Sequence, residues 1–543
     1  MATVPTRGGL LGRVKPLDAI LATAEKKSLH RSLGALQLTL FGIGCVIGTG
    51  IFVLTSAGAQ KAGPGLMLAF AIAGAICIVA ALCYAEIAAM IPVAGSAYTY
   101  TYSVMGELLA WTVGWALVLE YAVAASAVSV GWSGYFTGTI LNEFLGIQLP
   151  AFLAAGPLAL GGAPGGFINL PALVIALLVT WLLMIGTNES AKVNAVLVAI
   201  KVTALTVFII LTLPETELAK FNPFLPAGVF GGLGSGIGAV GAAATIFFAY
   251  VGFDAVSTAA EETRDPQRNV PIGLVGSLLI CTIFYILVAA GAIGASPTGG
   301  QPILGPGGIP FPAGSEELAR QCALPEYREW LVCSNEALAH VLRQIGYSSI
   351  GNMLGVAAFV ALPSVILILL FGQTRVFFVM SRDGLLPEKL STIHPKWKTP
   401  YVVTALTGAV VAVAAAFLPV GQLADIANAG TLYAFMMVAI AVMLLRKTEP
   451  NRPRKFRTPA LWLIGPLTVA GCIFLFVNLP LAAMLVLPIW AAIGLVIYYA
   501  YGYRHSHLGQ GRIEVHETEI DDIAPAIPGV DDDGAHRGLP DRA

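Results

Sequence analysis

Glycines and other small residues interrupt an apolar stretch at 36–59, in the run Gly42-Ile43-Gly44-Cys45-Val46-Ile47-Gly48-Thr49-Gly50-Ile51-Phe52. Glycine is unfavourable inside a helix, so the run predicts a break in a helix that is long enough to span a bilayer. Such a break leaves N–H groups at the start of one half-helix and carbonyl groups at the end of the other. These groups suit a carboxylate and a cation, and an amino acid carries both.

A second interrupted stretch lies at 236–261 and contains the run Phe247-Phe248-Ala249-Tyr250-Val251-Gly252-Phe253-Asp254. It follows the first by five apolar stretches. Interrupted helices at the same place in two halves of a chain indicate an inverted-repeat transporter, with the substrate between the breaks. We therefore expect both breaks to meet at one site.

The composition is typical of a polytopic membrane protein, because 57% of the 543 residues are hydrophobic and only 11% are charged. A net charge of −1 gives no indication of a nucleic-acid partner. The seven cysteines form no cluster with metal-ligand spacing, so no metal is predicted. All seven histidines fall outside the predicted spans, which argues against a histidine proton relay within the membrane.

Apolar runs of about 20 residues predict an all-α protein with twelve membrane helices. The ranges are 36–59, 65–92, 107–138, 168–187, 194–213, 236–261, 271–296, 350–380, 401–418, 421–446, 459–479 and 481–503. Lys and Arg gather in alternate connections, which places both termini in the cytoplasm. The first external connection is expected to hold Lys61 alone.

These ranges divide the chain into a 5+5 inverted repeat with additional segments. The predicted parts are a cytoplasmic leader 1–35, repeats 36–213 and 236–446, a long external loop 297–349, two further helices 459–503 and a disordered cytoplasmic tail 504–543. The external loop contains Cys322 and Cys333. We predict a disulfide between them, because disulfides persist outside the cytoplasm.

Three motifs closely resemble those of the cationic amino acid transporter family within the amino acid, polyamine and organocation superfamily. They are GIGCVIGTGIF at 42–52, FFAYVGFDAVSTAAEETRDPQRNVP at 247–271 and GQTRVFFVMSRDGLLP at 372–387. The resemblance implies broken first and sixth helices, alternating access and transport of L-amino acids, commonly coupled to protons in bacterial members. Animal members have fourteen helices, and the external loop with its two cysteines is not part of the family pattern.

By this resemblance, the first break offers N–H and hydroxyl donors to the substrate carboxylate, and carbonyls of both breaks accept from its ammonium. Phe248 stands where the family has an aromatic gate. The predicted substrate-binding residues of the breaks are Val46, Ile47, Gly48, Thr49, Gly50, Ile51, Phe248, Ala249 and Val251. The alternatives are that the glycines only allow close helix packing and that Phe248 is a core aromatic.

Three ionisable residues stand in apolar surroundings, where a charge is costly and often functional. Glu120 would tune the pocket toward cationic substrates or relay protons, and the alternative is a structural carboxyl. Asp254 would contact the pocket or hold the second half-helix. Lys201 would be the proton-coupling ammonium, taking the place of the sodium ion in related transporters, or else a fixed charge held by helix-end carbonyls.

Together these patterns predict a secondary transporter, with protons as the coupling ion and no other cofactor. Its partners would be an L-amino acid and membrane lipid. The sequence does not show whether a small single-span subunit is also present. A sodium-coupled or exchange transporter and a membrane amino-acid sensor are the alternatives. A membrane enzyme would need a nucleophile, a metal site or an acid-base cluster in the spans, and the sequence of the spans contains none. An enzyme is therefore not predicted. We expect the protein in a bacterial plasma membrane.

Overall fold

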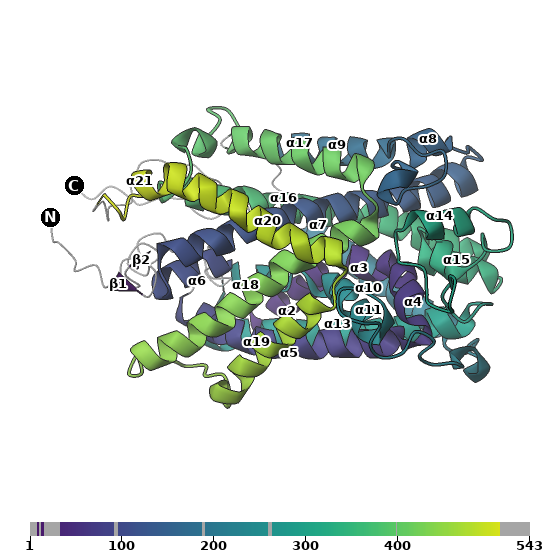
Figure 1. Cartoon of the computed structure of the whole chain (residues 1–543), viewed down its shortest axis with the longest axis horizontal. Helices are drawn as coiled ribbons and strands as arrows, with labels where there is room; N and C mark the ends of the chain where they lie inside the picture. The colour runs from purple at the N-terminus through teal and green to yellow at the C-terminus, as the bar shows by residue number, and fades with distance from the viewer. Residues whose placement is uncertain are drawn as a thin grey trace, which may run out of the picture.

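The computed structural model describes residues 8–9, 12–15, 33–91, 96–186, 191–258, 263–397 and 399–510. Most of these residues form helices that run roughly along the long axis of the molecule (Figure 1). Two short strands, β1 (Gly8–Gly9) and β2 (Gly12–Arg13), pair antiparallel near the N-terminus. The helices are α2 (Ala35–Val46), α3 (Thr49–Phe52), α4 (Leu54–Ala62), α5 (Leu66–Met90), α6 (Ser96–Val104), α7 (Glu107–Tyr135), α8 (Ala151–Ala154), α9 (Leu170–Ile185), α10 (Ala191–Thr212), α11 (Gly238–Ile246), α12 (Ala255–Thr258), α13 (Pro266–Ala295), α14 (Glu316–Cys322), α15 (Ala337–Gln344), α16 (Ser348–Arg382), α17 (Tyr401–Phe417), α18 (Val420–Thr448), α19 (Leu461–Val477), α20 (Leu481–Ile497) and α21 (Tyr503–His505).

Seven helical segments of the described part are long and apolar enough to cross a membrane: Leu54–Met90, Glu107–Phe144, Ala195–Thr212, Pro266–Ala295, Ser348–Arg382, Val420–Thr448 and Leu481–His505. An apolar helix or a broken apolar helix also lies in each of the twelve predicted ranges. The all-helical membrane architecture is therefore confirmed. The number of crossings, the inverted repeat and the division into segments stay predictions.

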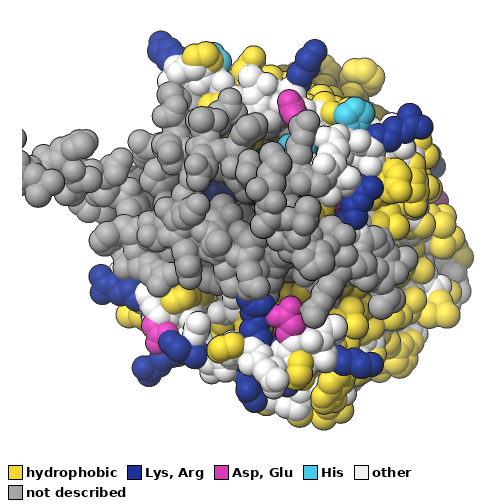
Figure 2. Space-filling model, turned by 90° about the vertical axis from the view of Figure 1, so that its left-hand side faces the viewer, with side chains coloured by type: hydrophobic (Ala, Val, Ile, Leu, Met, Phe, Trp, Pro, Cys, Tyr) yellow, Lys and Arg dark blue, Asp and Glu magenta, His cyan; other side chains and the backbone are white. Residues whose placement is uncertain are grey.

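The outer surface of the bundle carries large apolar side chains, as expected for contact with lipid. Trp181 of α9, Trp462 of α19 and Val496 of α20 are 58%, 63% and 70% exposed. Figure 2 looks at the end of the bundle where α6 and α21 lie, and it shows Lys and Arg side chains around that end and apolar side chains along the visible flank. This distribution fits an apolar belt bordered by a basic rim.

Helix α7 lies at the centre of the bundle and packs against α16, α17 and α18. On one side it is tied to α20 by two reciprocal hydrogen bonds. The indole N–H of Trp115 donates to the carbonyl of Trp490 (2.9 Å), and that of Trp490 donates to the carbonyl of Trp115 (2.7 Å). The two indoles also stack with their centroids 4.7 Å apart. α7 and α20 are thereby held in fixed register.

Lys61 is not in an external connection, so its predicted place in a loop is wrong. It lies within α4 and is only 3% exposed. Its ammonium is 3.1 Å from a carboxylate oxygen of Asp425 in α18, and it also donates to the hydroxyl of Thr245 in α11. The carboxylate neutralises the lysine, which is what allows this cation to be buried.

The predicted tail begins too early. Residues 504–510 belong to the described part, and Ser506 is fully buried and donates to Glu107 of α7. The backbone N–H of His507 donates to the carbonyl of Asp383 (3.1 Å). Residues 511–543 and most of the predicted leader lie outside the described residues.

The segment predicted as a long external loop contains α14 and α15. A disulfide joins Cys322, the last residue of α14, to Cys333, and the two Cα atoms are 5.4 Å apart. The side-chain amide of Gln60 in α4 donates to the carbonyls of Ile303 (2.9 Å) and Phe311 (3.0 Å). The loop is thereby attached to the second half of the first broken helix.

Candidate functional site

The first predicted break lies between α2 and α3. Helix α2 ends at Val46, Ile47 has an extended backbone (φ −71°, ψ 101°), and α3 begins at Thr49 after Gly48. The last carbonyls of α2 and the first N–H groups of α3 have no partner within their own helix, because a helix leaves four such groups at each end. The backbone therefore presents acceptors and donors at one point.

The second predicted break follows α11. The chain makes a 3-10 turn at Phe247–Tyr250, extends at Val251 and reaches Gly252 at φ +105° before α12. A side chain is strained at this positive φ, and an added Cβ would also lie 3.1 Å from the carbonyl oxygen of Cys45. Gly252 thus allows the second break to lie directly against the first.

Gly50 makes the same contact from the other side. An added Cβ on Gly50 would lie 2.2 Å from Cα of Ala249, which is backbone and cannot move aside. Two segments about two hundred residues apart therefore meet through glycine. The expectation that the breaks come together is confirmed by this geometry.

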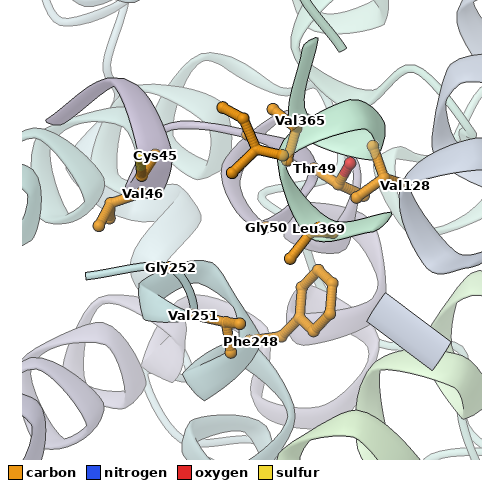
Figure 3. Close-up of a pocket in the computed structure, with 12 residues that line it drawn as sticks. Cys45, Val46, Thr49, Gly50, Val128, Phe248, Val251, Gly252, Val365 and Leu369 are labelled. Atoms are coloured by element: carbon orange, nitrogen blue, oxygen red, sulfur yellow. The ribbon is translucent and has the colours of Figure 1, made fainter. Parts of the chain in front are cut away.

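A pocket lies between the two breaks and is closed by α7 and α16 (Figure 3). In Figure 3 the ring of Phe248 stands below Leu369, and the side-chain oxygen of Thr49 lies beside Val128. The wall is mainly backbone and apolar side chains, and its residues are Cys45, Val46, Gly48, Thr49, Gly50, Val128, Phe248, Val251, Gly252, Val365, Ile368 and Leu369. Such a wall fits an uncharged, aliphatic group.

Few polar side chains line this pocket. The hydroxyl of Thr49 is buried and has no hydrogen-bond partner among the described residues. A buried hydroxyl without a partner is unfavourable, so a ligand oxygen or nitrogen at this point would satisfy it. On the carbonyl side, Val46 and Ala249 both accept from the phenol of Tyr285, at 2.8 Å and 3.0 Å.

Some of the predicted substrate-binding residues line the pocket: Val46, Gly48, Thr49, Gly50, Phe248 and Val251. Ile47, Ile51 and Ala249 lie in the same breaks but are not part of the lining. The sequence did not indicate the wall residues of α7 and α16, Val128, Val365, Ile368 and Leu369, because an apolar residue in an apolar helix carries no separate signal. Nor did it indicate Tyr285.

Glu120 and Asp254 are buried together, and neither is part of the pocket lining. The carboxylate of Glu120 in α7 lies close to Asp254 and Thr431. Asp254 follows the second break and accepts a hydrogen bond from the hydroxyl of Tyr121 (3.1 Å). The acids therefore lie outside the lining of this pocket. Their predicted contact with the substrate stays a prediction.

Lys201 of α10 is 2% exposed and reaches the first broken helix. Its ammonium donates to the carbonyl of Gly44 (3.2 Å), which lies within the last four residues of α2. This is the contact that the predicted proton-coupling role requires. The role itself stays a prediction.

Comparison with known proteins identifies the family. A family model described as amino acid permease matches residues 33–501. The chain is 43% identical to the branched-chain amino acid permease BcaP of Bacillus subtilis (strain 168), over 93% of this chain and 100% of the relative. It is 39% identical to the methylthioribose transporter of the same organism (92% and 99%). It is 35% identical to the vacuolar cationic amino acid transporter 4 of Arabidopsis thaliana (81% and 68%). The resemblance seen in the three motifs is confirmed by these matches.

Proposed function

The chain belongs to the amino acid permease family, and from this premise we propose that it takes up L-amino acids with aliphatic side chains, driven by protons, across a bacterial plasma membrane. Amino acid transport follows from the family. The substrate class, the coupling ion and the membrane are our proposal, and each has its own support.

The pocket between the breaks carries the proposal of an aliphatic substrate. Its side-chain wall is formed by Val128, Val365, Ile368 and Leu369, and Glu120 is not part of it. A cationic side chain would lose its hydration against this wall without a counter-charge, which is costly. The similarity to a branched-chain amino acid permease supports the same class. An aliphatic substrate therefore fits better than the cationic one that Glu120 suggested.

The substrate backbone would bind to the ends of the half-helices. The N–H groups that begin α3, with the hydroxyl of Thr49, would hold the carboxylate, because a helix N-terminus favours an anion. The carbonyls of Val46 and Ala249 would accept from the ammonium. Both ends of an amino acid are then held by the two breaks, and movement of the half-helices would open the site to one side at a time.

Lys201 is our proposed proton-coupling group. When protonated, its ammonium ties α10 to the carbonyl of Gly44 at the end of α2. When neutral, the amine binds the carbonyl less strongly, because a hydrogen bond from a charged donor is stronger. Loss of the proton would therefore loosen α2 beside the substrate site.

Uptake into proteoliposomes tests the proposal. Labelled leucine, isoleucine, valine, alanine, lysine and arginine are supplied with an inward proton gradient, with an inward sodium gradient, or with unlabelled leucine inside. We expect the proton gradient to drive accumulation of the branched aliphatic substrates. Gly50→Val is the control, since its side chain would collide with the backbone of Ala249.

Other outcomes would select the alternatives. A preference for lysine and arginine would show a cationic substrate class, and accumulation with sodium alone would show a sodium-coupled transporter. Uptake only against internal leucine would show exchange. Binding of leucine without uptake under any condition would show a sensor. Methylthioribose is included as a competitor because a similar protein is named for its transport.

A further inference from the structure

Tyr285 links the two breaks through a single hydroxyl group. It lies in α13 and is fully buried. Its phenol oxygen is 2.8 Å from the carbonyl oxygen of Val46 and 3.0 Å from that of Ala249. These carbonyls are 239 and 36 residues away in the sequence, and one belongs to each break.

The hydroxyl brings the two carbonyl oxygens toward one point. A substrate ammonium needs the same arrangement, since its nitrogen donates at about 2.7–2.9 Å to each oxygen. Carbonyls repel each other when their oxygens converge, unless a donor lies between them. The phenol has one proton, which the two carbonyl oxygens share. Each carbonyl oxygen has two lone pairs, so it can accept from this proton and from an ammonium at the same time.

Tyr285 is not part of the pocket lining. It reaches the carbonyls from α13, while α7 and α16 close the pocket on another side. The hydroxyl therefore reaches the two carbonyls from outside the pocket. Val46 is a lining residue, and Ala249 directly follows the lining residue Phe248.

We infer that Tyr285 is a positioning residue that holds the carbonyls of both breaks in the geometry required by the substrate ammonium. The inference rests on the proposed function, because it concerns the amino group of the transported amino acid. The hydroxyl contributes by preorganisation: the acceptors are ordered before the substrate arrives, so binding does not have to order them. Because the hydroxyl contacts one carbonyl of each break, substrate affinity would also depend on the distance between the two breaks.

Tyr250 offers a matched control: it ends the 3-10 turn of the second break but is not part of the pocket lining. Its ring packs against that of Tyr285 at a centroid distance of 5.4 Å, and it is equally buried. Its hydroxyl donates to the carbonyl of Phe70 in α5 (2.9 Å), away from both breaks. Tyr250→Phe and Tyr285→Phe therefore each remove one hydroxyl group from the same aromatic cluster. Only Tyr285→Phe removes the hydrogen bond to the carbonyls of Val46 and Ala249.

The test measures KM and maximal rate for leucine uptake in proteoliposomes, together with thermal unfolding of each variant. Tyr285→Phe should raise KM about 10-fold, the effect of losing one shared hydrogen bond, with little change in maximal rate. Tyr250→Phe should leave KM within about 2-fold of the wild type. Both should lower the unfolding temperature to a similar extent.

Two results would overturn the inference while the proposed function stands: an unchanged KM in Tyr285→Phe, or an equal rise in both variants, with leucine transport by the wild type intact. The first would show that the hydroxyl does not affect the acceptors. The second would show a general effect of the aromatic cluster. Absence of leucine uptake and binding in the wild type would instead overturn the proposed function itself.

Discussion

The substrate pocket and the charged groups around it use different residues. The side chains of the wall come from α7, α16 and the two breaks and carry no charge. The buried ionisable groups Glu120, Asp254, Lys201 and Lys61 instead contact the helices that carry the pocket. Under the proposed function, the wall would select the substrate, and the charged groups would hold the half-helices through contacts such as that of Lys201 with Gly44.

The charged groups also differ among themselves. Lys201 holds the first half of the broken helix through the carbonyl of Gly44, whereas Lys61 belongs to the second half and forms an ion pair with Asp425 in α18. The two contacts lie on opposite sides of the same break. Changes at the two lysines should therefore affect coupling and stability differently.

The largest expected effect is at Lys201. Lys201→Ala should abolish accumulation of leucine driven by a proton gradient, because the proton-binding ammonium is lost, while leucine should still bind because the wall is unchanged. Accumulation in proteoliposomes and binding by isothermal titration give the two measurements. If the variant still accumulates leucine with protons as the only driving ion, Lys201 is a fixed charge and not the coupling group.

The next effect concerns stability. Asp425→Asn should destabilise the protein by about 3–5 kcal/mol, because it leaves the ammonium of Lys61 buried without its carboxylate. The midpoint of thermal unfolding checks this. The double variant Lys61→Met/Asp425→Asn removes both charges and should be more stable than the single variant. A double variant that is less stable than Asp425→Asn would contradict this explanation, because removing the unpaired ammonium should recover stability.

These contrasts show how far the sequence could predict the site. The two breaks were found because glycine is unfavourable within a helix, and Lys201 because a charge in an apolar helix is conspicuous. The partners could not be found in this way. Asp425 is 364 residues from Lys61. The sequence around Lys61 does not show whether this lysine is buried in an ion pair or exposed in a loop. Tyr285 and the wall of α16 depend equally on contacts made only in the folded chain.

A smaller effect is expected at the wall. Leu369→Val removes one methylene group beside the substrate, which should change discrimination by about 10-fold, the lower end of what one methylene group contributes. The preference for phenylalanine over leucine, measured as a ratio of kcat/KM values, should rise. Ile366→Val in the same helix is the control, because Ile366 is fully buried but is not part of the pocket lining. Equal ratios in both variants would contradict the assignment of Leu369 to the wall.

The smallest change in preference is expected at Glu120. Because its carboxylate lies close to Asp254 and Thr431 and not in the pocket, Glu120→Gln should change uptake of leucine, alanine and lysine by the same factor. A carboxylate in the wall would behave differently: its removal would penalise lysine far more than leucine, since a desolvated ammonium needs a counter-charge. Competition of the unlabelled amino acids against labelled leucine, in wild type and variant, measures the ratios directly. If only lysine transport is weakened, Glu120 contacts the substrate, and the pocket wall and the charged groups do not have separate roles.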